Sequence, residues 1–268
     1  MKKPPKIMGI LNVTPDSFSD GGQFDVVDKA VERAHAMVAA GADIIDIGGE
    51  STRPGADVVG QDAELARVMP VIEALAGIDA EISIDTRRPA VAQAAVQAGA
   101  NIWNDVTALE FDMGSPDMAA KLGCKVVLMH MRGTPETMQD NPHYKNVVAE
   151  VMGYLKGRMS VAIKAGVKRE NIILDPGIGF GKRLEDNLDL LQHLDDFHIL
   201  GRPILLGASR KSFMGKIDGS DASERLGGSL ASALWGASMG ASVLRVHDVE
   251  ETVQAVRVWQ AIGEQEHG

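Results

Sequence analysis

Short apolar stretches alternate with longer amphipathic stretches along the chain. The short stretches have the length and β-branched character of buried strands, whereas the longer ones repeat their apolar residues at helical spacing. The eight strands predicted in this way are Lys6–Leu11, Asp43–Ile47, Glu81–Ile84, Asn101–Trp103, Lys125–Met129, Asn171–Leu174, Pro203–Leu206 and Ser242–Val246. The helices predicted to follow them are Asp25–Ala40, Gln61–Ala76, Arg88–Ala98, Ser115–Leu122, Tyr144–Ala165, Leu184–Leu194, Ser223–Met239 and Val249–Ile262.

This alternation of strand and helix implies that neighbouring strands are parallel. Eight such units in a chain of 268 residues predict an α/β fold, a closed (β/α)₈ TIM barrel. The alternative is an open, doubly wound sheet. Because no linker rich in Pro, Gly or Ser divides the chain, we expect one domain over residues 1–268.

One predicted helix, Ser223–Met239, carries small residues on one face. Ser229, Ala233 and Ala237 recur at a spacing of four, which places them on the same side of a helix. Such a face allows a second helix to approach closely, either within the chain or in another subunit. The uncharged stretch around it is too rich in Gly, Ala and Ser to be a membrane span.

Composition narrows the classes of partner. The 27 basic and 37 acidic residues give a net charge of −10, which argues against nucleic acid or an anionic membrane as the main partner. The single cysteine, Cys124, excludes an intramolecular disulfide and a thiolate zinc cluster. The apolar run Ile7–Leu11 is too short for a signal peptide, so we expect a cytoplasmic protein that acts on small molecules.

Chemically distinctive residues gather directly after the predicted strands, where ligands bind in barrels of this kind. The segments in question are Asn12–Gly22, Gly48–Gly55, Asp85–Arg87, Asn104–Asp105, His130–Arg132, Asp175–Lys182, Gly207–Ser212 and Arg245–Asp248. The segments before the strands are short and chemically plain. This one-sided placement predicts an enzyme.

Carboxylates form one candidate group in these segments. Asp46, Asp85 and Asp175 lie within or at the ends of apolar strands, where a carboxylate needs hydrogen-bond donors. The donor is either a structural partner, such as a buried arginine, or a ligand. With Asn104 beside them, these side chains match the donor edge of a flat heterocycle.

Positive side chains form the second candidate group. Arg53, Arg210, Lys211, Arg245 and His247 come from three loops that a closed barrel would bring to one mouth. On a protein of negative net charge they indicate an anion site. The alternative, for one or two of them, is pairing with the protein's own carboxylates.

Metal and phosphate-loop signals are weak. Asp175–Lys182 has neither Walker nor dinucleotide-loop spacing, so it is interpreted as a flexible lid or turn beside Asp175. Asn12, Asp16, Asp46 and Asp85 offer oxygen ligands that suit Mg²⁺ better than zinc. An ion carried by a diphosphate would need few of them.

The order of these motifs resembles the dihydropteroate synthase family. The resemblance rests on Met8–Gly22, Asp46–Gly55, Ile82–Thr86, Asn104–Asp105, Leu128–Gln139, Ile173–Lys182, Gly207–Phe213 and Arg245–Val249, which together span nearly the whole chain. It implies a TIM-barrel transferase of folate biosynthesis that joins 4-aminobenzoate to (7,8-dihydropterin-6-yl)methyl diphosphate and releases diphosphate. The family is the target of sulfonamides, which mimic 4-aminobenzoate.

The resemblance also implies residue roles. The residues implied to hold the pterin are Asp85, Asn104 and Asp175 at its edge, Lys211 on the ring, and Met129 and Phe180 as apolar walls, with Gly207 also in the substrate-binding set. Those implied to lie at the diphosphate are Arg53, Arg245 and His247, with Asn12 at Mg²⁺. Those implied to enclose 4-aminobenzoate are Phe18, Thr52, Pro54 and Ser212, where a helix beginning near Ser212 could offer backbone N–H groups.

Within this set, Asn12, Asp85, Lys211, Arg245 and His247 are expected to act in catalysis. A dissociative, SN1-like mechanism is expected, because diphosphate leaves readily once cations neutralise its charge. Such a mechanism needs no activated serine or cysteine, and the sequence indicates none. The resemblance implies a homodimer, and the small-residue face of Ser223–Met239 predicts that this helix region forms the interface.

Three other functions are alternatives to this transferase. A pterin barrel that transfers methyl groups would have no use for the cations of Ser209–Ser212 and Arg245–His247. A silent pterin-binding homologue would be expected to lose residues such as Asn12 or Lys211, and a phosphosugar enzyme would need a base at a strand end. The segment Thr107–Met118 is interpreted as a plain loop, the alternative being contact with the aminobenzoate pocket.

Overall fold

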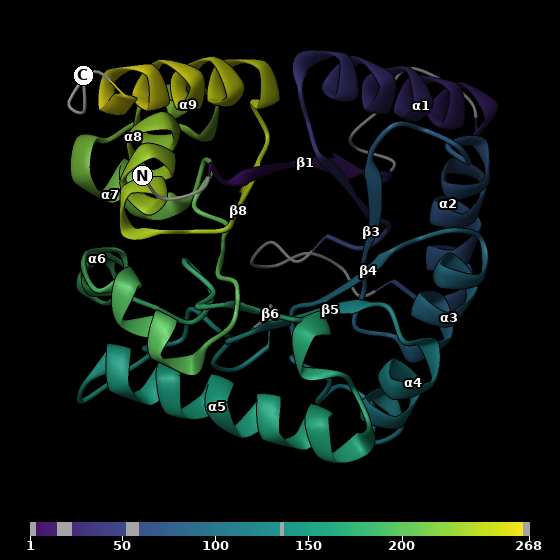
Figure 1. The fold of residues 1–268 in the computed structure, drawn as a ribbon, viewed down its shortest axis with the longest axis horizontal. Helices are drawn as coiled ribbons and strands as arrows, with labels where there is room; N and C mark the ends of the chain where they lie inside the picture. Colours follow the sequence, from purple (N-terminus) through teal and green to yellow (C-terminus); the bar gives the residue numbers. More distant parts are fainter. Residues whose placement is uncertain (1–3, 15–22, 52–58, 135–136, 265–268) are drawn as a thin grey trace.

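The computed structural model describes residues 4–14, 23–51, 59–134 and 137–264. Parallel strands occupy its centre and helices surround them (Figure 1). The strands in these ranges are β1 (Lys6–Asn12), β2 (Ile44–Gly48), β3 (Glu81–Asp85), β4 (Ile102–Asp105), β5 (Lys125–Met129), β6 (Ile172–Asp175), β7 (Leu205–Leu206) and β8 (Val243–Val246). They are ordered β6-β5-β4-β3-β2-β1-β8-β7 in the sheet.

The two ends of this sheet, β6 and β7, meet. Leu174 bridges Ile204 in parallel, and the backbone N–H of Leu174 donates to the carbonyl of Pro203 at 3.0 Å. Pro203 has no N–H to donate, which explains why β7 is shorter than the sequence predicts. This contact makes the sheet a nearly closed barrel, so the predicted (β/α)₈ fold is confirmed.

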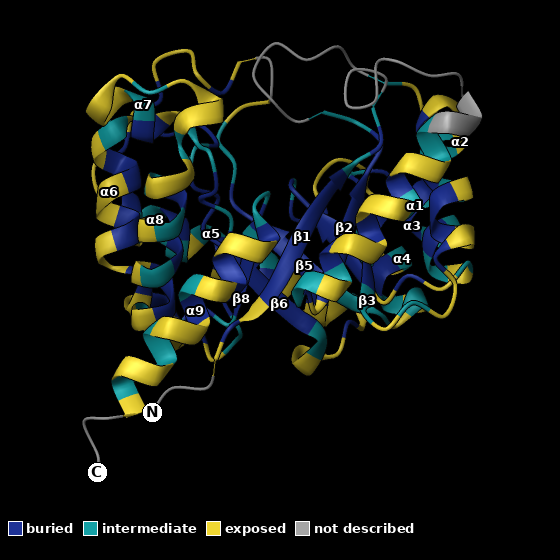
Figure 2. Cartoon of the chain, turned by 90° about the horizontal axis from the view of Figure 1, so that it is seen from above, coloured by how far each residue is buried: buried dark blue, intermediate teal, exposed yellow. Residues whose placement is uncertain are grey.

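The helices follow the predicted order. They are α1 (Gln23–Ala40), α2 (Gln61–Ala74), α3 (Pro89–Gln97), α4 (Ser115–Leu122), α5 (Val147–Ala165), α6 (Leu184–Gln192), α7 (Ser212–Asp218), α8 (Leu226–Met239) and α9 (Val249–Glu264), with 3₁₀ turns at Arg169–Asn171, Leu194–Leu200 and Ala222–Glu224. α5 begins later than predicted because the side chain of Asn146 accepts the Ala149 N–H at 2.9 Å and so caps the helix. Figure 2 shows the buried strands inside the partly exposed helices.

The small-residue face of α8 packs within the chain. Ser229, Ala233 and Ala237 are all buried, and the Ser229 hydroxyl accepts the backbone N–H of Arg210 at 2.9 Å. A Cβ at Gly236 would overlap the side chain of Leu206 on β7. This face therefore packs within the same chain, against β7 and the loop after it, and not against a second helix as the sequence predicted.

Apolar residues fill the lower part of the barrel interior. This buried cluster, which we call the plug, consists of Met8, Ile44, Ile102, Val127, Ile173, Leu205 and Val243. Side chains two positions apart on a strand point to the same face. The residues one layer above the plug are therefore Ile10, Asp46, Asn104, Met129, Asp175, Gly207 and Arg245. The polar residues expected to bind ligand thus lie directly on top of an apolar floor.

None of the helices in the described ranges combines the length and the apolar character needed to cross a membrane.

Candidate active site

Arg245 on β8 joins two carboxylates from neighbouring strands. Its Nε donates to Asp46 Oδ2 and its Nη2 to Asp85 Oδ2, both at 2.6 Å. The amide of Asn104 also donates to Asp46 Oδ2, at 3.2 Å. For Asp46 and Asp85 the predicted structural alternative, a buried arginine, is therefore present.

Burial and charge act against each other in this group. Burial lowers the pKa of Arg245, but Asp46 and Asp85 outweigh it and hold that pKa above its ordinary value. Burial raises the pKa of Asp85, and Asp46 adds to the rise while Arg245 opposes it. Arg245 is thus a permanent cation whose charge is shared between two acids.

A second predicted cation also pairs with the protein's own carboxylate. The guanidinium of Arg210 bonds both carboxylate oxygens of Asp248, with the Nε–Oδ2 distance at 2.9 Å. Arg210 and Arg245 therefore pair with the protein's own carboxylates, which was the alternative to an anion site. The net positive charge at the mouth is smaller than the number of cations suggests.

Asp175 ends β6 in a buried position. Its Oδ1 accepts the backbone N–H of Gly177 at 2.7 Å. Burial raises the pKa of Asp175, while that N–H and the charges of Lys211 and Arg245 lower it. A Cβ at Gly207 would lie 3.9 Å from Asp175 Oδ2, so the glycine keeps the space beside this oxygen clear.

Two apolar side chains line the mouth next to these acids. Met129 and Phe180 belong to one buried cluster with Val106 and Met138. The Nζ of Lys211 lies 3.9 Å from the centroid of the Phe180 ring, a cation–π distance. The structure thus brings Met129, Phe180 and Lys211 together, as the sequence predicted.

His247 differs from the prediction in its charge. Burial lowers the pKa of His247 to about 3, and Arg245 and Arg210 add to the effect. The Ser209 hydroxyl lies 3.1 Å from His247 Nδ1 and accepts the His247 backbone N–H at 3.2 Å. If this hydroxyl donates to Nδ1, the ring proton is on Nε2. His247 is therefore a neutral hydrogen-bond donor instead of a cation.

The neutral state of His247 makes stability depend on pH. The unfolded chain takes up a proton near pH 6.5 and the folded chain does not, so the free energy of unfolding falls as pH drops below that value. Between pH 7 and 5 we expect wild type to lose about 2 kcal/mol more than His247→Asn. Urea unfolding of both proteins measures this difference, and parallel pH curves would contradict it.

The segment Gly177–Lys182 forms a buried turn held against β5. Lys182 is 2% exposed, and its ammonium contacts His130 Nδ1 at 2.9 Å and the carbonyls of Gly177 and Phe180 at 2.8 and 3.0 Å. Of the two interpretations offered for this motif, the structure shows a turn and not a flexible lid.

Gly177 is needed for this turn for two reasons. Its φ is +69°, and a Cβ there would overlap the carbonyl oxygen of His130. We expect Gly177→Ala to cost about 2 kcal/mol more than Gly123→Ala, because Gly123 has φ +66° but nothing near its Cβ position. Thermal unfolding compares the two, and equal losses would show that the backbone contact is unimportant.

Asn12 ends β1 beside the acidic group. A Cβ at Gly48, its register partner on β2, would lie 3.7 Å from Asn12 Oδ1 and 3.8 Å from Asp85 Oδ2. In the described part of the chain, no group of three or more His, Cys, Asp or Glu side chains could hold a metal ion. The Mg²⁺ expected at Asn12 therefore stays a prediction.

Comparison with known proteins decides the family. Residues 8–247 match the family described as pterin binding enzyme. The dihydropteroate synthase of Escherichia coli K12 is 50% identical over 258 residues, covering 96% of this chain and 91% of that protein. The solved structure of Xanthomonas albilineans dihydropteroate synthase with 4-aminobenzoic acid superposes with a TM-score of 0.92 at 48% identity, covering 97% and 94% of the two chains.

The chain belongs to the dihydropteroate synthase family. A second Xanthomonas albilineans structure of the family, in complex with 7,8-dihydropteroate, has a TM-score of 0.88 at 45% identity, covering 97% of this chain and 94% of that one. The family and the transferase function expected from the sequence are confirmed.

Several residues that the sequence analysis singled out as candidate metal ligands or substrate-binding residues fall outside the described residues. These are Asp16, Phe18, Thr52, Arg53 and Pro54. Ser212 is described and begins α7, as expected. Phe111, in the Thr107–Met118 segment, is 48% exposed, and the centroid of its ring lies 4.6 Å from the Cζ of Arg87, a cation–π distance.

A buried ion-pair group that the sequence did not reveal lies behind the mouth. Arg88 bonds Glu50 at 2.8 Å and Glu64 at 2.6 Å, and also bonds the carbonyl of Val59. Burial raises the pKa of Glu64, with Arg88 opposing the rise. Arg88 was predicted only to start a helix, and no spacing in the sequence indicates a partner 38 residues away.

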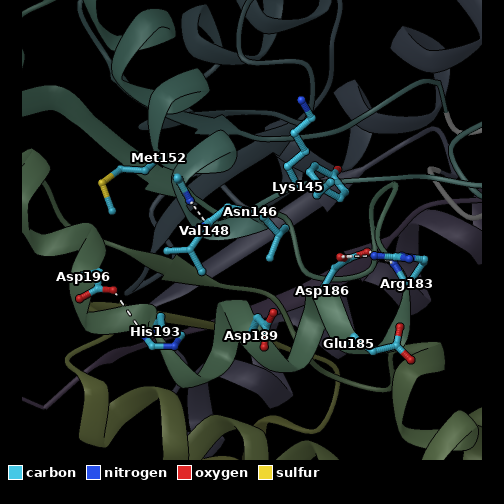
Figure 3. Close-up of a pocket in the computed structure, with 13 residues that line it drawn as sticks. Lys145, Asn146, Val148, Met152, Arg183, Glu185, Asp186, Asp189, His193 and Asp196 are labelled. Carbon is cyan, nitrogen blue, oxygen red and sulfur yellow. Dashed lines mark hydrogen bonds and ion pairs between the residues drawn. The ribbon is translucent and has the colours of Figure 1, made fainter.

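A groove of about 590 Å³ lies on the outside of the barrel, between the start of α5 and α6 (Figure 3). Two pairs form among its polar side chains: Arg183 bonds Asp186 at 3.0 Å, and His193 contacts Asp196 at 3.4 Å. Its lining contains none of the residues expected to bind the two substrates, so it is not the family's candidate site.

Proposed function

We propose that this chain joins 4-aminobenzoate to the methylene carbon of (7,8-dihydropterin-6-yl)methyl diphosphate, with release of diphosphate and formation of 7,8-dihydropteroate. The observation that carries the proposal is the layer above the plug, where Asn104 and Asp175 lie beside the apolar pair Met129 and Phe180. An apolar pocket with a few converging polar groups is the usual form of a small-molecule site.

The pterin is proposed to bind flat in this layer. Its amino and ring N–H groups donate to Asp175 and Asp85, and the amide of Asn104 recognises the same edge. Met129 and Phe180 line the face of the ring, and Lys211 contacts it from the loop after β7. Support comes from the burial of Asp85, Asn104 and Asp175, which are 8%, 4% and 5% exposed.

Mg²⁺ is proposed to accompany the diphosphate. The amide oxygen of Asn12 suits this ion, while Asp46 and Asp85 are bonded to Arg245. Such a donor set fits an ion held mainly by diphosphate oxygens and water. When bound, the ion neutralises charge on the leaving group. Arg245 and the Nε2–H of His247 are proposed to lie on the same side, with Arg53.

The reaction is proposed to be dissociative. The bond between the methylene carbon and the diphosphate oxygen breaks, and its electron pair leaves with diphosphate. The dihydropterin ring delocalises the cation, and the carboxylates of Asp85 and Asp175 stabilise it electrostatically. The amine nitrogen of 4-aminobenzoate then forms the new C–N bond and loses a proton to solvent. Holding both reactants in place supplies most of the remaining rate.

The second substrate is proposed to bind where the loops meet the start of α7. Ser212 begins this helix, and its neighbourhood offers backbone N–H groups to the carboxylate of 4-aminobenzoate. Phe18, Thr52 and Pro54 keep the enclosing role that the resemblance implies. We also propose a cytoplasmic location, which agrees with the single thiol, Cys124.

A homodimer through the α8 region is also proposed, but on a face other than the one that the sequence singled out. α8 exposes Trp235, which is 46% exposed and donates its Nε1–H to the Leu191 carbonyl at the end of α6, and α6 itself exposes Leu188. Apolar side chains gathered in this way favour an interface. Sedimentation at micromolar concentration tests it: a dimer is expected, and a monomer would remove the proposal.

Diphosphate release tests the reaction. Purified protein is supplied with Mg²⁺ and the dihydropterin diphosphate, with and without 4-aminobenzoate. We expect fast release and dihydropteroate with the amine, and slow release without it as water captures the cation. Release that is equally fast without the amine would contradict transfer to it. An absence of release with either mixture would contradict the proposal.

A further inference from the structure

The ammonium of Lys182 is buried, and within the described part of the chain no carboxylate bonds it. Besides His130 Nδ1 and the carbonyls of Gly177 and Phe180, the carbonyl of His130 lies 3.3 Å away. These acceptors belong to two segments, the end of β5 and the turn after β6. A single side chain therefore joins two neighbouring loops at the mouth of the barrel.

We propose that Lys182 is a positioning residue for the pterin. It holds the turn after β6 against His130, so that Asp175, which precedes the turn, and Phe180, which lies in it, face the ligand. The inference rests on the proposed function, because it takes Asp175 and Phe180 as pterin-binding residues.

The contacts around His130 fix the position of this turn. The His130 backbone N–H donates to the carbonyl of Asp175 at 3.0 Å, and its Nδ1 accepts from Lys182. Burial lowers the pKa of His130 to about 2, with Lys182 and Arg132 adding to the effect, so the ring is neutral. Because an ammonium can only donate, its contact with Nδ1 places the ring proton on Nε2. The His130 ring also packs edge-on against Tyr154 at 4.9 Å between centroids.

The charge of Lys182 also acts on Asp175. The charged groups that face Asp175 are Lys211 from the loop after β7, Arg245 on β8 and Lys182 from the turn after β6, and each favours the carboxylate. Lys182 itself is faced by Asp175 and Asp186, which favour its charged form, and by Lys211 and Arg132, which oppose it. Burial lowers the pKa of Lys182 to about 7. Without this ammonium, Asp175 would keep its proton to a higher pH.

A residue that only stabilises the fold would have a different effect. Tyr144 provides the matched control, because its hydroxyl donates to the carbonyl of Gly181 at 2.7 Å in the same turn, while its ring packs on the Arg132 guanidinium and not on a residue proposed to bind the pterin. Tyr144→Phe removes one hydrogen bond from the turn and no charge. It is expected to lower the melting temperature and to leave pterin binding within two-fold of wild type.

The experiment measures Kd for the dihydropterin diphosphate with Mg²⁺ from pH 6 to 9, together with KM for 4-aminobenzoate. For Lys182→Met we expect Kd to rise at least ten-fold at pH 7 and the acid-side loss of binding to move to higher pH. KM for 4-aminobenzoate should change less than two-fold. Should this variant fail to fold, Lys182→Gln, whose amide can still donate to the Gly177 carbonyl, gives the same test of charge.

The inference would be overturned if Lys182→Met bound the pterin with the same affinity and the same pH dependence as wild type. It would also be overturned by equal losses of affinity in Lys182→Met and Tyr144→Phe at equal melting temperatures. Asp175→Asn is measured beside them. If it binds pterin normally, the proposed role of Asp175 fails; if it loses binding while Lys182→Met does not, only the role of Lys182 fails.

Discussion

Asp175→Asn should lower kcat/KM for the pterin substrate by about 100-fold or more, which corresponds to about 2.7 kcal/mol of transition-state stabilisation. The carboxylate has one oxygen on the Gly177 N–H and a second beside Gly207, facing the mouth. An amide in its place offers one acceptor instead of two and carries no charge to stabilise the pterin cation. Steady-state kinetics with the pterin varied at saturating 4-aminobenzoate measures the loss.

Asp105→Asn is the matched control for this change. Asp105 is also buried at the end of a strand, where burial raises its pKa to about 6, but its oxygens are bonded to Thr107 and Leu109. We expect this variant to lose stability and to keep kcat/KM within about five-fold once folded. If Asp175→Asn also stayed within a few-fold of wild type, Asp175 would not bind the pterin.

The largest expected effect on stability comes from Arg245→Met. The side chain of Arg245 is 18% exposed and holds two carboxylates of still lower exposure, Asp46 and Asp85. Removing it leaves two like charges buried next to each other without a cation. A loss of about 3–5 kcal/mol in the free energy of unfolding is expected, together with loss of activity. Urea unfolding at pH 8, where the carboxylates resist protonation, measures the change.

A double variant separates charge from packing. In Asp46→Asn/Arg245→Met one of the two repelling charges is gone, so part of the stability should return. Activity should not return, since the proposed contact of Arg245 with the diphosphate side is still missing. If the single variant were as stable as wild type, the buried ion pairs of Arg245 would not matter to the fold.

Much of the barrel could be predicted from the sequence because each strand is short, apolar and followed by a helix. The sequence predicts the wrong end of a strand or helix where a single side chain or backbone group sets that end. Pro203 cannot donate to a sheet, so β7 is two residues long, and the side chain of Asn146 caps α5, so the helix begins at Val147. The small-residue face of α8 was recognised, but only the structure shows that Leu206 covers it.

The site could be predicted as a set of residues but not as a pattern of charges. Motif positions placed Asn104, Asp175 and Met129 at strand ends, and the register of the barrel brings them to one layer. The charge state depends on contacts between distant parts of the chain, such as Arg245 with Asp46, and on burial, which makes His247 neutral. The spacing of Asp175–Lys182 excludes a Walker phosphate loop, but it does not show that the Lys182 ammonium folds back onto the carbonyls of its own turn.

A crystal structure of the protein with the dihydropterin diphosphate and Mg²⁺ tests the central claim most directly. The pterin is expected in the layer above the plug, with its amino edge on Asp175 and Asn104 and its ring along Met129 and Phe180. A pterin bound in the outer groove between α5 and α6, or at the mouth without contact to Asp175, would contradict the proposed site.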